Sequence, residues 1–235
     1  MATDEAARIV SRPVVIDVIR QLCRDYRKAT GRLPGILIGV GGTAMMLHGL
    51  RGQSADVDLF TKDQGVPQVA GMVQAQVDGQ PIDIDVTSNP YLWGEVPVTD
   101  IEDDAQVVEQ VEIEPGEFVS IAAISKETLF ILKACSGRDK DMPDVVRLAS
   151  RTSPEAVVRR LATISDRTDA DLSEQVYKVL ATLQENHGWS LLPEWFSGIS
   201  GKTLTQWQPV LESLTGDPDF AERPAPAAGR RMKFG

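Results

Sequence analysis

Residues 36–60, ILIGVGGTAMMLHGLRGQSADVDLF, constrain the fold of this chain more than any other stretch. They open with an apolar run of strand length that is bounded by proline and glycine. Gly41 and Gly42 end this run, and adjacent glycines let the backbone turn tightly and let another group approach its amides closely. We therefore expect a strand, a glycine turn, a short helix over residues 44–50 and a second strand over residues 55–60.

Three polar residues flank or belong to the expected short helix. Thr43 precedes it and is expected to be its N-cap, and the unpaired amides at that end favour a phosphate. Arg51 follows the helix, and two interpretations of it stay open: a contact with a triphosphate, or a surface salt bridge, for example with Asp56. His48 lies within the helix and has no visible partner, so we expect it to pack and not to catalyse.

Asp56 and Asp58 are candidate metal ligands in the second expected strand. Side chains of a strand alternate between its faces, so these two carboxylates share one face while Val57 and Leu59 take the other. Two carboxylates one pleat apart, opposite a glycine turn, make a site for a divalent cation that carries a phosphate.

These two motifs together carry a family resemblance. The pattern GG-T-A-x-x-L-H-G-L-R followed by D-V-D-L-F resembles the signature of the DNA-polymerase-β-type nucleotidyltransferase superfamily. Within it, the sequence is most similar to bacterial AbiEii-like and related toxin-type nucleotidyltransferases. Residues 129–145, LFILKACSGRDKDMPDV, resemble the helical K…GR-x-KD-x-x-D segment of those proteins. The resemblance covers residues 33–150, and the two motifs in this order are more specific than either alone.

The resemblance implies an α/β fold of the α+β type, with a small mixed-sheet nucleotidyltransferase core flanked by helices over residues 1–150. Apolar residues at helical spacing predict a helical C-terminal region over residues 151–222. Residues 223–235 are rich in proline, alanine and glycine and are expected to be a flexible basic tail.

Within the core, the apolar pattern predicts a helix over residues 13–30 that covers the sheet with one buried stripe, in which Cys23 serves as a small hydrophobe. Strands are expected before the Pro115–Gly116 turn and over residues 118–124. A helix then runs from residue 126 to residue 136.

A polymerase-type site needs a third carboxylate from a neighbouring strand. Residues 81–87, PIDIDVT, alternate strictly, which places Asp83 and Asp85 on one face of a strand. Both aspartates fit the family pattern of an aspartate between apolar residues. We favour Asp85, because the residues after it resemble the family strand where it runs into its loop, and keep Asp83 as the alternative.

The remaining site candidates follow from the same resemblance. Lys133 matches the lysine that holds the NTP phosphates and would share in catalysis, and Arg138 and Asp144 match later positions of the same segment. The candidates for nucleotide binding around the glycine turn are Gly41, Gly42, Thr43 and Arg51. Tyr91 and Trp93, just past the third strand, either stack on a nucleobase or cover the core as a lid.

An active member of this superfamily moves a nucleoside monophosphate from an NTP to an acceptor, with Mg²⁺ or Mn²⁺ as cofactor. By resemblance the acceptor is an RNA 3′ end, such as that of tRNA, or a protein hydroxyl. The protein would then be the toxin of a toxin–antitoxin system, with a cognate antitoxin or a target protein as partner. Two other interpretations stay open: a catalytically degenerate module of this fold that binds a nucleotide or a protein, and an antitoxin-like partner whose acidic surface mimics nucleic acid.

The formal charge of −10 is distributed unevenly. Residues 95–117 contain nine acidic residues and no lysine or arginine, whereas residues 118–160 carry eight basic residues against five acidic ones. We expect the acidic span to be a solvated face. The acidity of the whole chain argues against unselective binding of nucleic acid but leaves room for a local basic surface.

The sequence also indicates the cellular compartment of the protein. No apolar stretch is long enough to span a membrane, and the N-terminus MATDEAARIVSRP is too acidic and polar for a signal peptide. Cys23 and Cys135 lie far apart without ligand-like spacing, which argues against a disulfide framework or a zinc site. We therefore expect a cytoplasmic protein that does not bind membranes.

Overall fold

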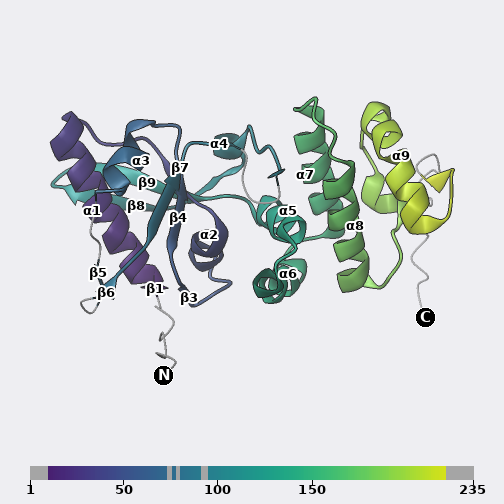
Figure 1. Cartoon of the computed structure of the whole chain (residues 1–235), viewed down its shortest axis with the longest axis horizontal. Coiled ribbons are helices and arrows are strands. Elements are labelled where there is room, and N and C mark those ends of the chain that lie inside the picture. Colours follow the sequence, from purple (N-terminus) through teal and green to yellow (C-terminus); the bar gives the residue numbers. More distant parts are fainter. Residues whose placement is uncertain (1–9, 73–75, 78–79, 91–94, 221–235) are drawn as a thin grey trace, which may run out of the picture. The chain divides into compact units, whose positions relative to one another are not determined.

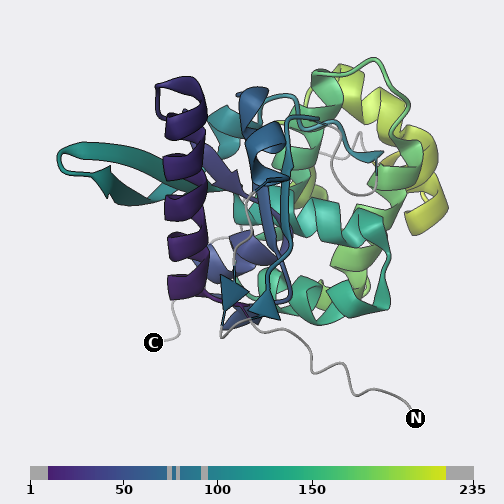
Figure 2. The ribbon, with the colours of Figure 1, turned by 60° about the vertical axis from the view of Figure 1, so that its left-hand side comes forward.

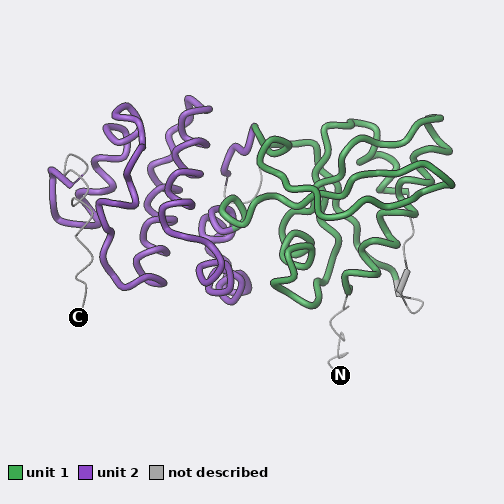
Figure 3. The backbone as a smooth tube through the Cα atoms, turned by 180° about the vertical axis from the view of Figure 1, so that it is seen from behind, with its two compact units in different colours: residues 1–90, 100–129 green, residues 91–99, 130–235 purple. Residues whose placement is uncertain are grey.

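A five-stranded sheet organises the first part of the chain. Its strands are, in spatial order, β7 (Ile84–Thr87), β4 (Val57–Phe60), β2 (Leu37–Gly39), β9 (Glu117–Ala123) and β8 (Gln106–Glu114). The structure, a computed structural model, describes residues 10–72, 76–77, 80–90 and 95–220 (Figure 1). Its contacts group the chain into two compact units, residues 1–90 with 100–129 and residues 91–99 with 130–235 (Figure 3). The division at residues 150 and 222 that the sequence suggests stays a prediction.

The sheet is mixed, because β2 lies in its middle between an antiparallel and a parallel neighbour. β2 pairs antiparallel with β4 and parallel with β9, while β4 pairs parallel with β7 and β8 pairs antiparallel with β9. Leu37 and Ile38 of β2 are fully buried, as expected for a strand that is covered on both faces. The mixed sheet and its surrounding helices confirm the predicted α/β fold class.

The helices of the first unit are α1 (Arg12–Thr30), α2 (Gly41–Leu47), α3 (Gly65–Ala70) and α4 (Ile101–Asp104). Helix α1 confirms the helix predicted over residues 13–30, with a proline in its first turn and its apolar stripe buried. Burial raises the pKa of the Cys23 thiol to about 12, so this cysteine acts as a small hydrophobe, as expected.

The acidic span reaches solvent, as expected, and part of it also pairs with α1. Strands β8 and β9 form a hairpin that reaches past α1 in Figure 2, and α1 packs against β8. Arginines of α1 pair with glutamates of this hairpin: Arg12 with Glu109 at 3.1 Å, Arg24 with Glu114 at 3.8 Å, and Arg27 with Glu117. The helix predicted to cover the sheet therefore also neutralises part of its acidic edge.

Two short strand pairs lie beside the main sheet. β1 (Val10–Ser11) pairs antiparallel with β3 (Gln53–Ser54), and β5 (Gln76–Val77) pairs antiparallel with β6 (Gln80–Pro81). These pairs shorten two predicted strands. The strand expected over residues 55–60 begins at Val57. The one expected over residues 81–87 begins at Ile84, and Pro81 belongs to β6.

The second unit is helical. It contains most of α5 (Lys126–Ser136), then α6 (Met142–Ala149), α7 (Pro154–Asp166), α8 (Ser173–His187) and α9 (Gly201–Thr215), with 3-10 turns at Asp139–Asp141 and Pro193–Phe196. Helix α5 has the predicted bounds, and the Ser125 hydroxyl caps it by accepting the Thr128 N–H at 3.1 Å. The helical pattern predicted for the C-terminal region is confirmed within the described residues.

Some expectations fall on residues that the structure does not describe. Tyr91 and Trp93 lie outside the described residues, and so does the basic tail over residues 223–235. Within the described part of the chain, no helix is both long and apolar enough to cross a membrane.

Candidate active site

Asp58 and Asp85 lie side by side on neighbouring strands. The parallel pairing of β4 with β7 places Asp58 directly opposite Asp85, with Leu59 opposite Val86 in the next register position. Neighbouring strands are about 4.8 Å apart, and residues in register point to the same face of a sheet. The Asp58 side chain is half-buried and that of Asp85 is exposed. The fold therefore brings together two carboxylates that are distant in the sequence, on a face that solvent reaches.

Asp56 and Asp83 lie one pleat earlier, just before β4 and β7 begin. The Val57 N–H donates to the Asp83 carbonyl oxygen at 3.0 Å, so strand pairing continues to this point. The Ser54 hydroxyl donates to an Asp56 carboxylate oxygen at 3.2 Å. Asp56 is half-buried and Asp83 is exposed. All four aspartates thus belong to one end of the β4–β7 pair, and the register groups Asp85 with Asp58.

The glycine turn differs from the expected one at its cap. Helix α2 begins at Gly41, where φ is +53°, and its N-cap is Val40, not Thr43. The predicted cap at Thr43 is wrong because this residue is inside the helix and fully buried. Its hydroxyl accepts the Asp58 N–H at 2.9 Å, and the Asp58 carbonyl accepts the Val40 N–H at 3.1 Å. Thr43 therefore anchors the backbone of the aspartate strand to the turn, a role that the sequence pattern did not signal.

Strand β3 approaches the glycine turn so closely that position 42 has no room for a side chain. A Cβ atom at this position would lie 2.2 Å from the Ser54 hydroxyl oxygen and 3.3 Å from the Ser54 Cβ. It would also lie 3.8 Å from an Arg51 Nη1 atom, which places the exposed Arg51 guanidinium beside the turn. The two interpretations of Arg51, a triphosphate contact and an ion pair, both remain open.

His48 packs, as predicted. Its Nε2 atom lies 2.7 Å from the Ile124 carbonyl oxygen, at the end of β9. Burial lowers the pKa of His48 below the usual value for histidine, so the neutral ring donates this hydrogen bond at neutral pH. The contact ties α2 to the central sheet.

In the second unit, Lys133 is the centre of a buried ion cluster. Only 5% of the residue is exposed, and its ammonium contacts Asp141 at 2.7 Å and Asp144 at 3.0 Å. The sequence did not single out Asp141, although the K-D-x-x-D spacing places it and Asp144 three residues apart on a helical turn. Lys133 therefore holds two buried carboxylates in this structure, and its contact with NTP phosphates stays a prediction.

Further hydrogen bonds complete this cluster. Asp141 also accepts the Ser136 hydroxyl at 2.8 Å and the Arg138 Nε at 2.6 Å, and Asp144 accepts the Arg147 Nη1 at 2.9 Å. Burial raises the pKa of Asp141, but the hydrogen bonds from Lys133 and Ser136 and the lysine charge outweigh it and leave that pKa below its usual value. The predicted residues Arg138 and Asp144 are thus brought together with Lys133.

The carboxylates of the first unit fit a metal–nucleotide complex by their donor chemistry. Mg²⁺ bound with a nucleotide usually takes one or two carboxylates from the protein and its other ligands from phosphates and water. Asp58 and Asp85, in register on neighbouring strands, offer two such ligands. Among the described residues, no three histidine, cysteine, aspartate or glutamate side chains gather closely enough to hold a metal by themselves. Asp58 and Asp85 would be the protein ligands of such a complex, and the metal stays a prediction.

The comparisons point in the same direction as the motifs. A family model described as "Nucleotidyltransferase of unknown function (DUF6036)" matches residues 16–186. This span contains the glycine turn, all four aspartates and the Lys133 cluster. No curated protein and no solved structure matches the chain.

Replacing Gly42 by alanine is expected to destabilise the protein by about 1–3 kcal/mol, because the added methyl group overlaps the Ser54 side chain. Urea unfolding measures the decrease in the free energy of unfolding. Gly35→Ala is the matched control, since a Cβ there meets nothing within 4 Å. The double variant Gly42→Ala/Ser54→Ala should recover part of the loss. Equal stability of Gly42→Ala and Gly35→Ala would contradict the close approach of β3.

Replacing Lys133 by methionine is expected to cost about 3–5 kcal/mol of stability at pH 7, because two buried carboxylates lose their shared cation. The exposed Lys140→Met is the control and should change stability by less than about 0.5 kcal/mol. Chemical denaturation of both variants gives the comparison.

The same pair of variants tests the sign of the pH dependence. The folded-state pKa of Asp141 is lowered, so its contribution is present at neutral pH and is lost as the pH falls through that pKa. The difference in the free energy of unfolding between Lys133→Met and the unmodified protein should therefore become smaller below about pH 4, which is close to the usual pKa of an aspartate. If this difference in unfolding free energy is the same in acid, the loss of charge pairing is not what destabilises Lys133→Met.

Proposed function

We propose, because the chain belongs to the DUF6036 family of nucleotidyltransferases, that it moves a nucleoside monophosphate from an NTP to a hydroxyl acceptor in a reaction that needs Mg²⁺ or Mn²⁺. The observation that carries this proposal is the register of Asp58 with Asp85 on β4 and β7. It supports a two-carboxylate site on a solvent-accessible face, next to a glycine turn whose backbone is bonded to the same aspartate strand.

In this proposal, Asp58 and Asp85 orient the metal-bound triphosphate. The metal, when bound, neutralises negative charge that develops on the transferring and leaving phosphates. Thr43 and Val40 fix the backbone of Asp58, so that its carboxylate is positioned before the substrate arrives. The acceptor oxygen forms a bond to the α-phosphorus as the bond to pyrophosphate breaks. Asp56 lies two residues before Asp58, just ahead of β4, and we assign it to the metal or to the acceptor proton.

The acceptor and the biological setting are proposed from the motif resemblance. An RNA 3′ end, such as that of tRNA, or a protein hydroxyl would receive the nucleotide. As in the AbiEii-like proteins that the motifs resemble, the chain would act in the cytoplasm as the toxin of a toxin–antitoxin pair. A cognate antitoxin or target protein would then be its partner, and Lys133 and Arg138 of the second unit would contact the nucleotide.

One observation favours a second candidate, a degenerate module that binds a nucleotide or protein without chemistry. Lys133, which the resemblance assigns to the NTP phosphates, already contacts two buried carboxylates. If these contacts persist with nucleotide present, the triphosphate lacks this cation. Release of pyrophosphate from an NTP separates the two candidates, because a module that only binds releases none.

Asp58→Asn and Asp85→Asn are each expected to lower nucleotide transfer at least about 100-fold, because the metal that they hold supplies several kcal/mol of transition-state stabilisation. Transfer is measured as Mg²⁺-dependent release of pyrophosphate and as labelling of an RNA pool from an α-labelled NTP. Thermal unfolding should show both variants folded, since removing one of two adjacent like charges relieves repulsion.

Asp83→Asn is the matched control, with the same substitution two residues earlier in the chain, before β7 begins and outside the register pair. It should keep most of the activity. If Asp83→Asn loses activity and Asp85→Asn keeps it, the site lies one pleat earlier, at Asp56 and Asp83. Full turnover in both Asp58→Asn and Asp85→Asn would refute the two-carboxylate site.

A further inference from the structure

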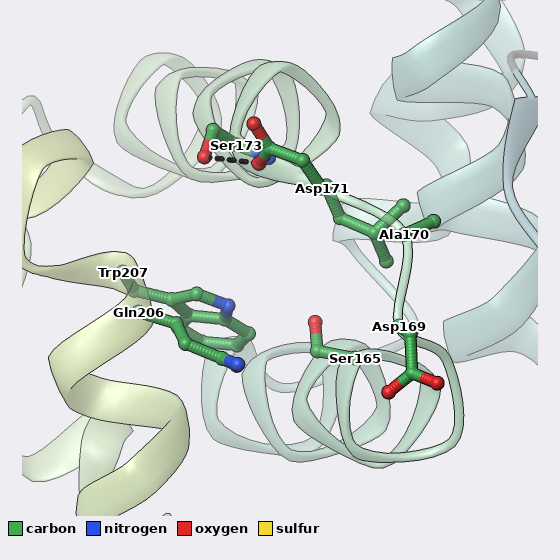
Figure 4. A pocket seen from close by; sticks show the side chains of 8 residues that line it. Ser165, Asp169, Ala170, Asp171, Ser173, Gln206 and Trp207 are labelled. Atoms are coloured by element: carbon green, nitrogen blue, oxygen red, sulfur yellow. Dashed lines mark hydrogen bonds between the residues drawn. The ribbon is translucent and has the colours of Figure 1, made fainter.

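The second unit contains a cavity that the proposed transferase site does not use. It lies between α9 and the connection from α7 to α8, with a volume of about 290 Å³ (Figure 4). Ligand pockets usually start at about 300 Å³, so this cavity suits a ligand of few heavy atoms.

Ser165 of α7 supplies the first sign of a ligand. Only 7% of the residue is exposed, and its hydroxyl oxygen is buried without a hydrogen-bond partner. Figure 4 shows this hydroxyl directed into the cavity, between Trp207 and Ala170. Buried polar side chains almost always have a partner in the protein or in a bound molecule. A molecule in the cavity would provide the partner that the protein does not.

The charge of the lining gives the second sign. Asp169 and Asp171 border the cavity from the α7–α8 connection as exposed residues, and no lysine or arginine lines it. Figure 4 shows the Asp171 carboxylate turned to Ser173 and the Asp169 carboxylate turned away from Trp207. The Asp171 carboxylate accepts the Ser173 N–H at 2.9 Å and the Ser173 hydroxyl at 2.6 Å. These hydrogen bonds lower the pKa of Asp171, so it is charged at neutral pH. Two carboxylates without a basic neighbour in the lining favour a cation.

The remaining lining side chains select the type of cation. Trp207 of α9 presents its indole across the cavity from Ala170, and Leu172 adds an apolar side chain. An indole attracts an ammonium group and also packs against methylene groups. An inorganic ion would contact only the polar lining, whereas an amine on a short carbon chain contacts both kinds of lining.

We propose that this cavity binds a small aliphatic amine, with the Ser165 hydroxyl accepting a hydrogen bond from its ammonium group and Asp169 and Asp171 balancing its charge. Trp207 and Leu172 contact its carbon chain. The proposal concerns the second unit alone and holds whether or not the first unit transfers nucleotides.

Isothermal titration calorimetry of the full chain with 1,4-diaminobutane tests the proposal, and 1,4-butanediol is the matched neutral probe. We expect saturable binding of the diamine in buffer of physiological ionic strength and no binding of the diol. The double variant Asp169→Asn/Asp171→Asn should bind the diamine with an affinity at least about tenfold lower, because charged hydrogen bonds and ion pairs are lost. Asp139→Asn, an exposed aspartate of the same unit outside the lining, is the control and should bind normally.

Ser165→Ala separates a ligand role from a structural one. Because the hydroxyl has no partner in the free protein, its removal should leave the Tm unchanged or raise it. The same substitution should lower the affinity for the diamine severalfold. A clear fall in Tm would show that the hydroxyl already has a partner, such as a buried water, and would overturn the proposal. So would the absence of saturable diamine binding, equal binding of the diol, or unchanged affinity in the Asp169→Asn/Asp171→Asn variant.

Discussion

The parallel pairing of β4 with β7 is the constraint on which the candidate site depends. Its register is fixed by apolar residues: Val57 and Leu59 of β4 and Val86 of β7 are buried, so a slip of one residue would turn them towards solvent. The same register places Asp58 beside Asp85 on the other face. Hydrophobic burial thus holds together two carboxylates that would repel each other as isolated groups, and the bonds of Asp58 to Thr43 and Val40 connect them to the glycine turn.

The Lys133 cluster plays the corresponding part in the second unit. Releasing Lys133 to a phosphate would leave Asp141 and Asp144 short of a cation in a buried environment, which costs several kcal/mol. Arg138 is more exposed and bonds to the same cluster, so it can reach solvent without breaking the central ion pairs. We therefore assign Lys133 a structural role in the free protein, while its contact with a nucleotide remains part of the proposal.

The sequence predicted what depends on local pattern and missed what depends on distant contacts. The bounds of α1 and α5 and the alternation in the aspartate strands follow from apolar spacing and were predicted closely. Thr43 was misjudged as a cap because its partner, Asp58, is brought to it only by the return of the chain into the sheet. The two ion partners of Lys133 are three residues apart in the sequence, but the turn at Asp139–Asp141 that brings them to the lysine was not predicted. The cavity depends on α9 meeting the α7–α8 connection, which no local pattern encodes. The assignment to nucleotidyltransferases agrees with the family match, whereas the choice of Asp85, the metal and the acceptor remain predictions.

The proposed site requires Asp58 and Asp85 to hold the metal of a metal–nucleotide complex together. A crystal structure of the full chain with Mn²⁺ and a non-hydrolysable NTP analogue, with the Mn²⁺ located by its anomalous signal, would show whether they do. We expect an ion that bridges the triphosphate and carboxylate oxygens of both residues, at roughly 2.0–2.6 Å from each. An ion bound by Asp83 without Asp85, or an analogue bound with no metal at either aspartate, would contradict it.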